Sequence, residues 1–522
     1  MEAAAPGVLN MFINLASVND PSFFEKSFFW PVAEPEKDLL YDRLVAAGIA
    51  LIDNETDQLQ EEIIRVFVPY LILYFFTVYM SQRVIDGFKQ RGERIDKYTP
   101  SPIDFYSWLI NGTRLDARFF VKRPVSYADP KTLAKYAIRK LLWRPTQQVL
   151  LNSNITVESY LKMNGVRFFR SKTYDWFSPF DRFEAPVAVK PVLGGKIFGY
   201  FRDAAMPMTV SDEAQKHLKD FIDYSVAFIA GTIGVLKQKS LTGRVRRLYT
   251  ATQGAFSTRV VSTAVKSQGG TVCAFPHGGG FFWVDFPGYW LVEQLTASTF
   301  FCYTQAERIG RERQAAALKR QPTASLEVLP DNGAHRTGSG SYGRIRRVMF
   351  LSGSFSGDRT FVGLLSEIQR FDLEVRIVKE LLACGLKVVV KFHRKSRALK
   401  QQTAFFSQMF GGSVEIMDTP LTEMLRRGCA ADAFVSENIT GGSLVEVMKT
   451  DKPVILFTPH PYLLSEDVRE QFLRRVRMFV CRMDENNRAV FDKDEVHAYF
   501  RKESYSYTYD LVNRFTNSQF EY

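Results

Sequence analysis

A histidine followed by three glycines stands directly after an apolar run that is typical of a buried strand. The run covers 269–276, and His277, Gly278, Gly279 and Gly280 come next. A histidine at such an edge can act as a general base near neutral pH. The glycines allow a ligand to approach the backbone closely. The pattern therefore predicts a catalytic base at His277; the alternative is a histidine that caps the next turn.

A cationic group ends a second apolar run, which begins at residue 386. The polar residues there are His393, Arg394 and Lys395. Several donors at one strand end suit an anion such as phosphate. The alternative is a solvated basic loop.

A third group leads from the apolar run 431–436 into a helix-forming stretch. Thr440, Gly441, Gly442 and Ser443 are small, and the free N–H groups of a helix N-terminus bind phosphate readily. The turn is thus predicted to bind phosphate. The alternative is an ordinary helix N-cap formed by Thr440 or Ser443.

Two carboxylates stand near these groups. Glu437, beside the third group, is a candidate for binding a ribose or sugar hydroxyl, with a strand-end cap as the alternative. Asp285 lies eight residues after His277 and is the second candidate for a catalytic base. In such a loop Asp285 is otherwise a turn or cap residue.

The elements that would position these residues alternate between strand and helix patterns, once from about 244 and again from about 345. Predicted strands cover 244–252, 269–276, 345–352, 386–393, 413–417, 431–436 and 452–459. Predicted helices cover 257–268, 365–384, 420–429, 441–450 and 465–476. Such alternation indicates α/β domains with parallel, doubly wound sheets. In these sheets ligands bind beyond the carboxyl ends of the strands, where all of the groups above stand.

Composition and missing motifs exclude several classes. With 522 residues, 46% hydrophobic and 24% charged, the chain is neither a disulfide-stapled mini-scaffold nor a disordered or collagen-like protein. No GxGxxG follows a predicted strand, and P-loop and GxSxG motifs do not occur, which argues against dinucleotide oxidoreductases, P-loop enzymes and α/β-hydrolases. The five cysteines form no CxxC and indicate free thiols. No residues have metal-ligand spacing, so we expect metal-independent chemistry without a cofactor.

The formal net charge is +12, and its excess is uneven. Nine Lys or Arg against two Asp or Glu lie in 114–144, where 131–144 fits an amphipathic helix. Such a helix binds an anionic membrane surface or packs with a solvated face; without interleaved aromatic residues, nucleic acid is not expected as a partner.

The 17 uncharged residues between Arg65 and Arg83 are short for a membrane span and predict a buried or interfacial helix. We expect a cytoplasmic protein, with peripheral attachment at the inner membrane as the alternative.

Three segments resemble one known family. They are AFPHGGGFFW, the long stretch TPLTEMLRRGCAADAFVSENITGGSLVEVMKTDKPVILFTP, and the aromatic helix IIRVFVPYLILYFF. The sequence is similar here to bacterial surface-carbohydrate biosynthesis transferases, which are related to CDP-glycerol and CMP-Kdo transferases. Pro276 stands where that family has Gln, and Arg394 where it has Pro.

The resemblance implies a GT-B-like architecture, in which two Rossmann-like domains face each other across a cleft. The expected organisation has a helix-rich region (1–240) and a Rossmann-like part (241–320) forming the acceptor-side half. A linker (321–344), a donor-binding Rossmann-like domain (345–490) and C-terminal helices that pack back (491–522) follow.

The resemblance also implies an inverting transfer of a sugar or related unit. The donor would be a nucleotide-activated sugar, with CMP or CDP favoured, and the acceptor a glycan or lipid-linked molecule. His277 would be the base, Gly278–Gly280 the acceptor loop, and His393 a ligand of the donor phosphate. Two rival interpretations stay open. One is a non-catalytic scaffold of the envelope-assembly machinery; the other is a nucleotide-sugar epimerase, which needs paired acid and base carboxylates that the sequence does not identify.

Overall fold

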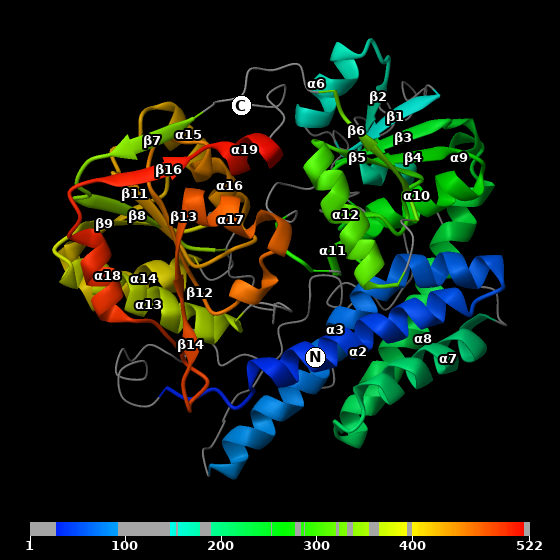
Figure 1. The fold of residues 1–522 in the computed structure, drawn as a ribbon. Helices are drawn as coiled ribbons and strands as arrows, with labels where there is room; N and C mark the ends of the chain where they lie inside the picture. Colours follow the sequence, from blue (N-terminus) through cyan, green and yellow to red (C-terminus); the bar gives the residue numbers. More distant parts are fainter. Residues whose placement is uncertain are drawn as a thin grey trace, which may run out of the picture.

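The structure, a computed structural model, shows two α/β halves and a helical layer that lies against the first of them (Figure 1). The described residues are 28–91, 147–152, 155–177, 189–251, 253–276, 283–286, 288–319, 323–330, 338–353, 365–393 and 399–515. The predicted basic helix 131–144 lies outside them.

The first half contains a six-stranded parallel sheet in the order β2-β1-β3-β4-β5-β6. Its strands are β1 (Gln148–Leu151), β2 (Phe169–Ser171), β3 (Arg247–Thr250), β4 (Thr271–Ala274), β5 (Thr299–Cys302) and β6 (Ser325–Val328). Its other elements are α6 (Ile155–Met163), η2 (Thr173–Trp176), α9 (Ser240–Arg244), α10 (Phe256–Ser267), α11 (Gly288–Glu293) and α12 (Gln305–Ala317). β3 and β4 lie where strands were predicted, whereas β1 and β2 come from the stretch expected to be helix-rich.

Four long helices form the layer beside this sheet: α2 (Glu34–Asp53), α3 (Gln58–Gln90), α7 (Val189–Ala205) and α8 (Asp212–Gln238). α3 and α8 pack on α10, which joins the layer to the sheet. Aromatic rings fill the interface between the helices, as in the contacts of Phe67 and Tyr74 with Phe221. The chain has 44 phenylalanines among its 522 residues, and those in these helices help to form a deep core.

Pro69 lies inside α3 and cannot donate the helical hydrogen bond to the carbonyl of Arg65. The guanidinium of Arg259, on α10, donates to that carbonyl and, over 3.1 Å, to the carbonyl of Val66. It also donates to the carbonyl of Val292 over 2.9 Å. Arg259 is fully buried, and burial lowers its pKa to about 10. One cation therefore joins α3, α10 and α11.

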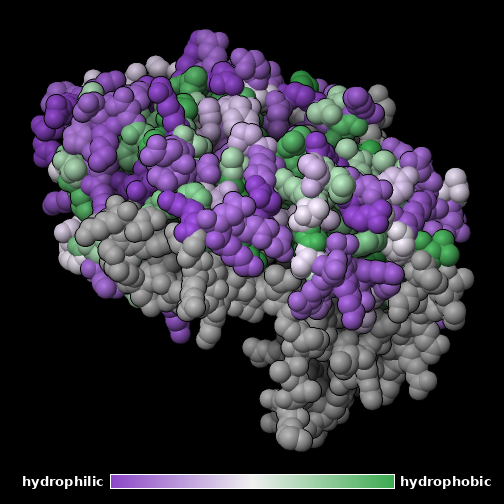
Figure 2. Space-filling model, turned by 90° about the horizontal axis from the view of Figure 1, so that it is seen from below, coloured by the Kyte–Doolittle hydropathy of each residue, from purple (hydrophilic) through white to green (hydrophobic). Residues whose placement is uncertain are grey.

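α3 is long and apolar enough to cross a membrane by length and composition, and 72% of its most apolar window is buried inside the protein. The same figures fit the core helix of a soluble protein. On the face of the molecule seen in Figure 2, hydrophilic residues cover most of the described surface and hydrophobic ones are scattered among them.

The second half contains a six-stranded parallel sheet in the order β10-β9-β8-β11-β12-β13. Its strands are β8 (Arg347–Leu351), β9 (Lys387–Lys391), β10 (Val414–Met417), β11 (Ala433–Ser436), β12 (Val454–Thr458) and β13 (Val476–Val480). Its helices are α13 (Glu367–Ala383), α14 (Leu399–Phe410), η3 (Gly411–Ser413), α15 (Leu421–Arg426), α16 (Gly442–Met448), η4 (Pro461–Leu463) and α17 (Glu466–Arg475). This strand order is that of the Rossmann fold, whose switch point here lies between β8 and β11. The predicted class, two Rossmann-like α/β domains, is confirmed by the two sheets.

The C-terminal part consists of α18 (Lys493–Phe500), β16 (Tyr505–Thr508) and α19 (Asp510–Phe515), preceded by the short strands β14 (Arg482–Met483) and β15 (Ala489–Val490). α18 packs on the second half, where Glu495 pairs with Arg477. β16 pairs with β7 (Ser339–Tyr342). α19 contacts both α17 and α12, and it thereby joins the C-terminal part to the first half. The stretch 321–344, expected to be a linker, contributes β6 to the first sheet and also contains β7.

Candidate functional site

The carboxyl ends of the two sheets face each other. Val284, in the loop after β4, forms an antiparallel bridge with Leu464, in the loop after β12. The N–H of Asp285 donates to the carbonyl of Leu463 over 2.7 Å, and the N–H of Ser465 donates to the carbonyl of Trp283 over 2.8 Å. These bonds bring the loop after β4 and the loop after β12 together at the domain junction. In parallel sheets of this kind, ligands bind at the strand ends from which such loops leave.

Trp283 anchors the first half in the core of the second. Its indole is 1% exposed and packs on Phe472 of α17, with the ring centroids 5.8 Å apart. Its Nε1 donates to the carbonyl of Ile439 over 2.9 Å. The loop that leaves β4 therefore ends against the turn between β11 and α16.

His277 and Gly278–Gly280 lie outside the described residues. The described neighbours on either side are Pro276, at the carboxyl end of β4, and Trp283, at the turn before α16.

The turn predicted to bind phosphate is held by Asn438. Its Oδ1 accepts from the N–H of Thr440 over 3.0 Å and from the hydroxyl of Thr440 over 2.9 Å. Gly441 is the N-cap of α16 and makes no side-chain cap bond, so neither Thr440 nor Ser443 caps the helix. Gly442 is exposed, and no atom lies within 4 Å of the position a Cβ would take. The two hydrogen bonds therefore fix the turn at Thr440, while the space beside Gly442 is free of protein atoms.

At the end of β9, His393 is exposed, while Arg394 and Lys395 lie outside the described residues. Lys391, two residues before His393, is buried and donates from Nζ to the carbonyl of Phe392 over 2.7 Å. His393 thus stands at the same sheet edge as the Thr440–Ser443 turn.

Glu437 lies at the topological switch point. Its Oε1 accepts from the N–H of Gly353, the second residue after β8, over 3.1 Å. Its side chain is 1% exposed and lies 3.9 Å from the guanidinium of Arg370 on α13. The carboxylate expected to bind a donor hydroxyl is therefore directed inward and joins the loops that follow β8 and β11.

A second carboxyl, that of Glu374 on α13, hydrogen bonds to Glu437. The hydroxyl of Ser352 donates to Glu374, with 2.9 and 3.0 Å to its two oxygens. Burial and the negative charge of Glu437 raise the pKa of Glu374 well above its usual value, while Arg370 opposes this shift. Burial raises the pKa of Glu437 as well, but the bonds from Glu374 and Gly353 lower it. Burial of the pair thus acts against two full negative charges at this point.

This pair bears on the epimerase interpretation. Both carboxyl groups are buried and bonded to each other. An acid and a base that act on opposite faces of a substrate need two separate, accessible groups. The Glu374–Glu437 pair does not meet that need.

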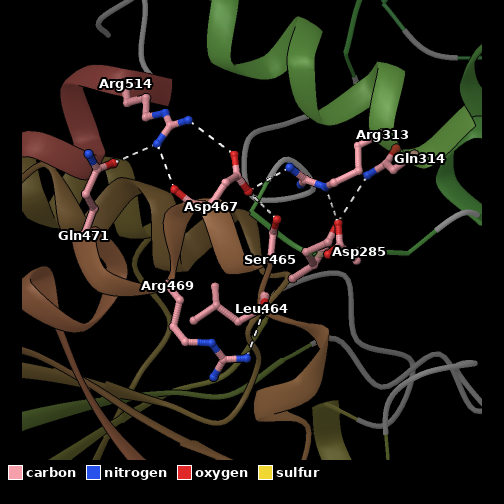
Figure 3. A network of polar contacts seen from close by, with 10 residues as sticks. Asp285, Arg313, Gln314, Leu464, Ser465, Asp467, Arg469, Gln471 and Arg514 are labelled. Atoms are coloured by element: carbon pink, nitrogen blue, oxygen red, sulfur yellow. Dashed lines mark hydrogen bonds and ion pairs between the residues drawn. The ribbon is translucent and has the colours of Figure 1, made fainter. Parts of the chain in front are cut away.

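Asp285 belongs to a charged network across the domain junction (Figure 3). Its Oδ1 accepts from Nε of Arg313 over 2.5 Å, and Nη1 of Arg313 donates to Asp467 over 2.7 Å. Arg514 pairs with Asp467 over 3.2 Å from α19. The carboxylate of Asp285 thus pairs with Arg313 within the first half, and Arg313 makes the contact to Asp467 of the second half.

His460, which sequence reasoning missed, is buried at the end of β12. Its Nδ1 lies 3.0 Å from the hydroxyl of Tyr462, which donates to Asp38 over 2.8 Å. Because the only hydroxyl proton of Tyr462 goes to Asp38, Nδ1 of His460 carries the proton and Nε2 is the unprotonated nitrogen. Nε2 lies 3.7 Å from Glu34, whose partner is Lys37. Burial, with Lys37 nearby, lowers the pKa of His460 well below its usual value.

Comparisons with known proteins give fold-level likeness only. No known family and no curated protein matches the chain. The chain is similar to UDP-GlcNAc 2-epimerase of Methanocaldococcus jannaschii, solved with UDP-GlcNAc and UDP (10% identity, TM-score 0.39, covering 71% of this chain and 96% of that one). It is also similar to E. coli heptosyltransferase WaaC with ADP (13%, 0.27, 67% and 98%). A third similar structure is SsfS6, a glycosyltransferase of Streptomyces sp. SF2575 (12%, 0.23, 60% and 81%).

Among the described residues, no group of three or more His, Cys, Asp or Glu side chains is arranged to hold a metal ion. All five cysteines are free thiols.

Proposed function

We propose that this protein is a glycosyltransferase-like enzyme that moves a sugar or related unit from a nucleotide-activated donor to a glycan or lipid-linked acceptor. The observation that carries the proposal is the meeting of the carboxyl ends of two Rossmann-like sheets at Trp283 and Ile439. Each sheet offers a binding edge, and the two edges bring two substrates together in one place.

The proposed chemistry is an inverting, metal-independent transfer. His277 takes the proton of an acceptor hydroxyl, and the acceptor oxygen forms a bond to the anomeric carbon. The bond from that carbon to the donor phosphate oxygen breaks, and its electron pair leaves with the nucleotide. The Thr440–Ser443 turn, with His393, Arg394 and Lys395, offsets the charge that develops on the phosphate.

The donor and the location are finer parts of the same proposal. CMP- or CDP-linked donors follow from the resemblance of the motifs around His277 and 431–459 to surface-carbohydrate transferases. The basic segment 114–144 supports attachment to an anionic membrane, at the cytoplasmic face where nucleotide-activated donors are made.

A thermal-shift panel of CMP, CDP, UDP, GDP, ADP and the corresponding nucleotide sugars tests donor binding. A nucleotide at 100 times its Kd stabilises the folded state by about 2.7 kcal/mol. Gly442→Val is expected to abolish the shift, because a side chain there blocks approach to the turn. Gly412→Val is the matched control, since Gly412 also has no atom within 4 Å of its Cβ position. If no nucleotide shifts the wild type, the proposal is overturned.

Transfer itself is tested with His277→Ala. Donor binding should stay nearly intact, because the phosphate groups lie on the other half, while transfer falls by roughly 100- to 10,000-fold. Lost donor binding would make His277 a ligand rather than a base. Retained transfer would move the role elsewhere, with Asp285→Asn as the next variant to measure.

The direct bonds between the halves favour a second candidate, a non-catalytic scaffold. Asp285, Val284 and Trp283 occupy part of the junction with protein–protein contacts. A scaffold would bind glycan or anionic vesicles without any nucleotide-dependent stabilisation. The same nucleotide panel, run beside vesicle sedimentation, separates the two candidates.

A further inference from the structure

Residues 28–33, which we call the strap, precede α2 and lie between the two halves. One side of the strap faces the end of α3, and the other faces the turn between β14 and β15 (484–488). The strap has no regular secondary structure, yet Phe28, Trp30 and Val32 are buried. Its position is therefore set by contacts with its neighbours rather than by hydrogen bonds within the segment.

Trp30 is bonded through both of its backbone groups to the turn between β14 and β15. Its N–H donates to the carbonyl of Asn486 over 2.9 Å, and its carbonyl accepts from Nδ2 of Asn487 over 2.8 Å. The guanidinium of Arg488 lies over the ring of Phe28, 5.2 Å from the centroid. Three successive residues of the turn thus hold the strap.

This turn belongs firmly to the second half. Nε2 of Gln369, on α13, donates to the carbonyl of Asn487 over 2.8 Å. Arg488 pairs with Asp372, also on α13, over 2.6 Å. The turn is therefore fixed to α13 independently of the strap.

The other side of the strap packs on the last turns of α3. The rings of Phe29 and Phe88 meet edge to face with centroids 5.7 Å apart, and the guanidinium of Arg91 lies 4.0 Å from the centroid of Phe29. A Cβ on Gly87 would lie 2.2 Å from Cβ of Pro31. Only glycine at position 87 leaves room for the strap in this place.

The strap continues into α2, which reaches the loops at the domain junction. Asp38 accepts from the hydroxyl of Tyr462, in the loop after β12, over 2.8 Å. Tyr41 stacks on Phe286, in the loop after β4, with ring centroids 5.4 Å apart. One continuous segment, 28–41, therefore contacts the β14–β15 turn and the loops that leave both ligand-binding edges.

We infer that the strap fixes the angle between the two halves, and that its release lets them turn about the Trp283 junction. A single anchor such as Trp283 leaves two bodies free to rotate about it, whereas a second attachment at a distance removes that freedom. The strap is attached near β14, at the opposite end of the second half from α19 (Figure 1). This inference goes beyond the proposed function and does not depend on it.

The bond between the strap and the turn can be removed without disturbing the turn. Asn487 has φ 53°, a left-handed conformation that glycine adopts freely. Asn487→Gly therefore removes the donor to Trp30 and preserves the backbone. Lys319→Gly is the matched control, because Lys319 has φ 55° and follows α12 in the first half.

A second variant acts on the opposite side of the strap. Gly87→Ala places a methyl group where Pro31 lies and forces the strap away from α3. Gly234→Ala is its matched control, since Gly234 lies within α8 and no atom is within 4 Å of its Cβ position. Both substitutions raise helix propensity equally, so only the contact with the strap differs between them.

Three measurements on the full chain test the inference: exchange of the Trp30 amide proton, exchange of the Asp285 amide proton, and small-angle scattering. Asn487→Gly should speed exchange at Trp30 by about tenfold. Gly87→Ala should speed it further and increase the radius of gyration. Exchange at Asp285, whose N–H donates to Leu463 across the junction, should stay at the wild-type rate in both variants. Both controls should match wild type in all three measurements.

Wild-type exchange at Trp30 in both variants overturns the inference. A wild-type scattering profile in a Gly87→Ala protein with fast Trp30 exchange also overturns it, because the strap is then released without any movement of the halves. Equally fast exchange at Asp285 means general unfolding and counts against a strap that acts separately from the Trp283 junction. Should Gly87→Ala not fold, Asn487→Gly carries all three measurements, since it leaves α3 unchanged. No nucleotide enters the experiment, so failure of the proposed function does not affect its outcome.

Discussion

Trp283 shows how one residue can determine the relation of two domains. Its ring lies in the core of the second half, although the residue belongs to the loop that follows β4 of the first half. Trp283→Phe keeps most of the ring but removes the N–H that donates to Ile439. It should lower the free energy of unfolding by about 1 kcal/mol, the usual net value of one buried hydrogen bond. Trp283→Ala should cost about 3–5 kcal/mol.

Urea unfolding followed by circular dichroism measures both variants of Trp283. Trp290→Phe is a suitable control, because Trp290 is equally buried but belongs to the core of the first half. An unchanged stability of Trp283→Ala would mean that the indole does not hold the junction.

Single residues were also where sequence reasoning was most limited. The turn at Thr440–Gly442 could be located because it follows a strand of strongly apolar residues. Glu374 gave no such signal, since a glutamate inside a helix pattern resembles any solvated carboxylate until α13 is seen to be buried. His460 could have been found, because it follows the buried strand β12 just as His393 follows β9.

At the scale of elements, α2 is held to the end of β12 by groups that titrate. His460 faces Glu34 and Lys37 of α2, and Tyr462 connects it to Asp38. The folded-state pKa of His460 is lowered, so its contribution to stability is present above about pH 6.5 and is lost as the pH falls. Burial raises the pKa of Glu34 above its usual 4.5, which acts in the opposite sense, because the folded state then keeps a proton that the unfolded state releases.

Between pH 7.5 and 5, one extra proton taken up by the unfolded state lowers stability by at most about 1.4 kcal/mol per pH unit. His460→Asn should flatten this slope, because its amide replaces the Nδ1 donor and cannot titrate. Urea unfolding across that pH range measures the slope. His217→Asn is the control, since His217 lies on α8 with only a 3.7 Å contact to Glu213. An equal slope in His460→Asn and wild type would contradict the prediction.

The pattern of elements was predictable where strands are long and apolar. β8, β9, β11 and β12 lie inside the predicted ranges because uninterrupted apolar runs are typical of strands buried on both faces. β1 and β2 have only four and three residues, and their neighbours are helical. The pairing of β2 with β1 and of β1 with β3 therefore depends on tertiary contact. β13 follows α17 without a turn, and the helical pattern of 465–476 hid its start.

At the scale of the whole molecule, the junction combines one deeply buried anchor with an exposed charged network. Trp283 provides the former, and Arg313, Asp467 and Arg514 provide the latter. Exposed ion pairs contribute only about 0–1 kcal/mol each, and salt screens them. The network is thus suited to adjusting the angle between the halves rather than to holding them together.

Asp467→Asn tests that division of roles, because it removes the charge that faces both Arg313 and Arg514. Overall stability should change by less than about 1 kcal/mol, while the mean separation of the halves increases. Small-angle scattering measures that separation, and 1 M salt should reproduce the effect in wild type because screening then acts within roughly 3 Å. Glu470→Gln, on the same helix but paired only with Arg474 four residues away, is the control.

If the proposed transfer needs both edges close together, Asp467→Asn should reduce transfer without changing nucleotide affinity. A variant that binds nucleotide, transfers normally and keeps the wild-type scattering profile would show that the charged network has no part in positioning the two halves.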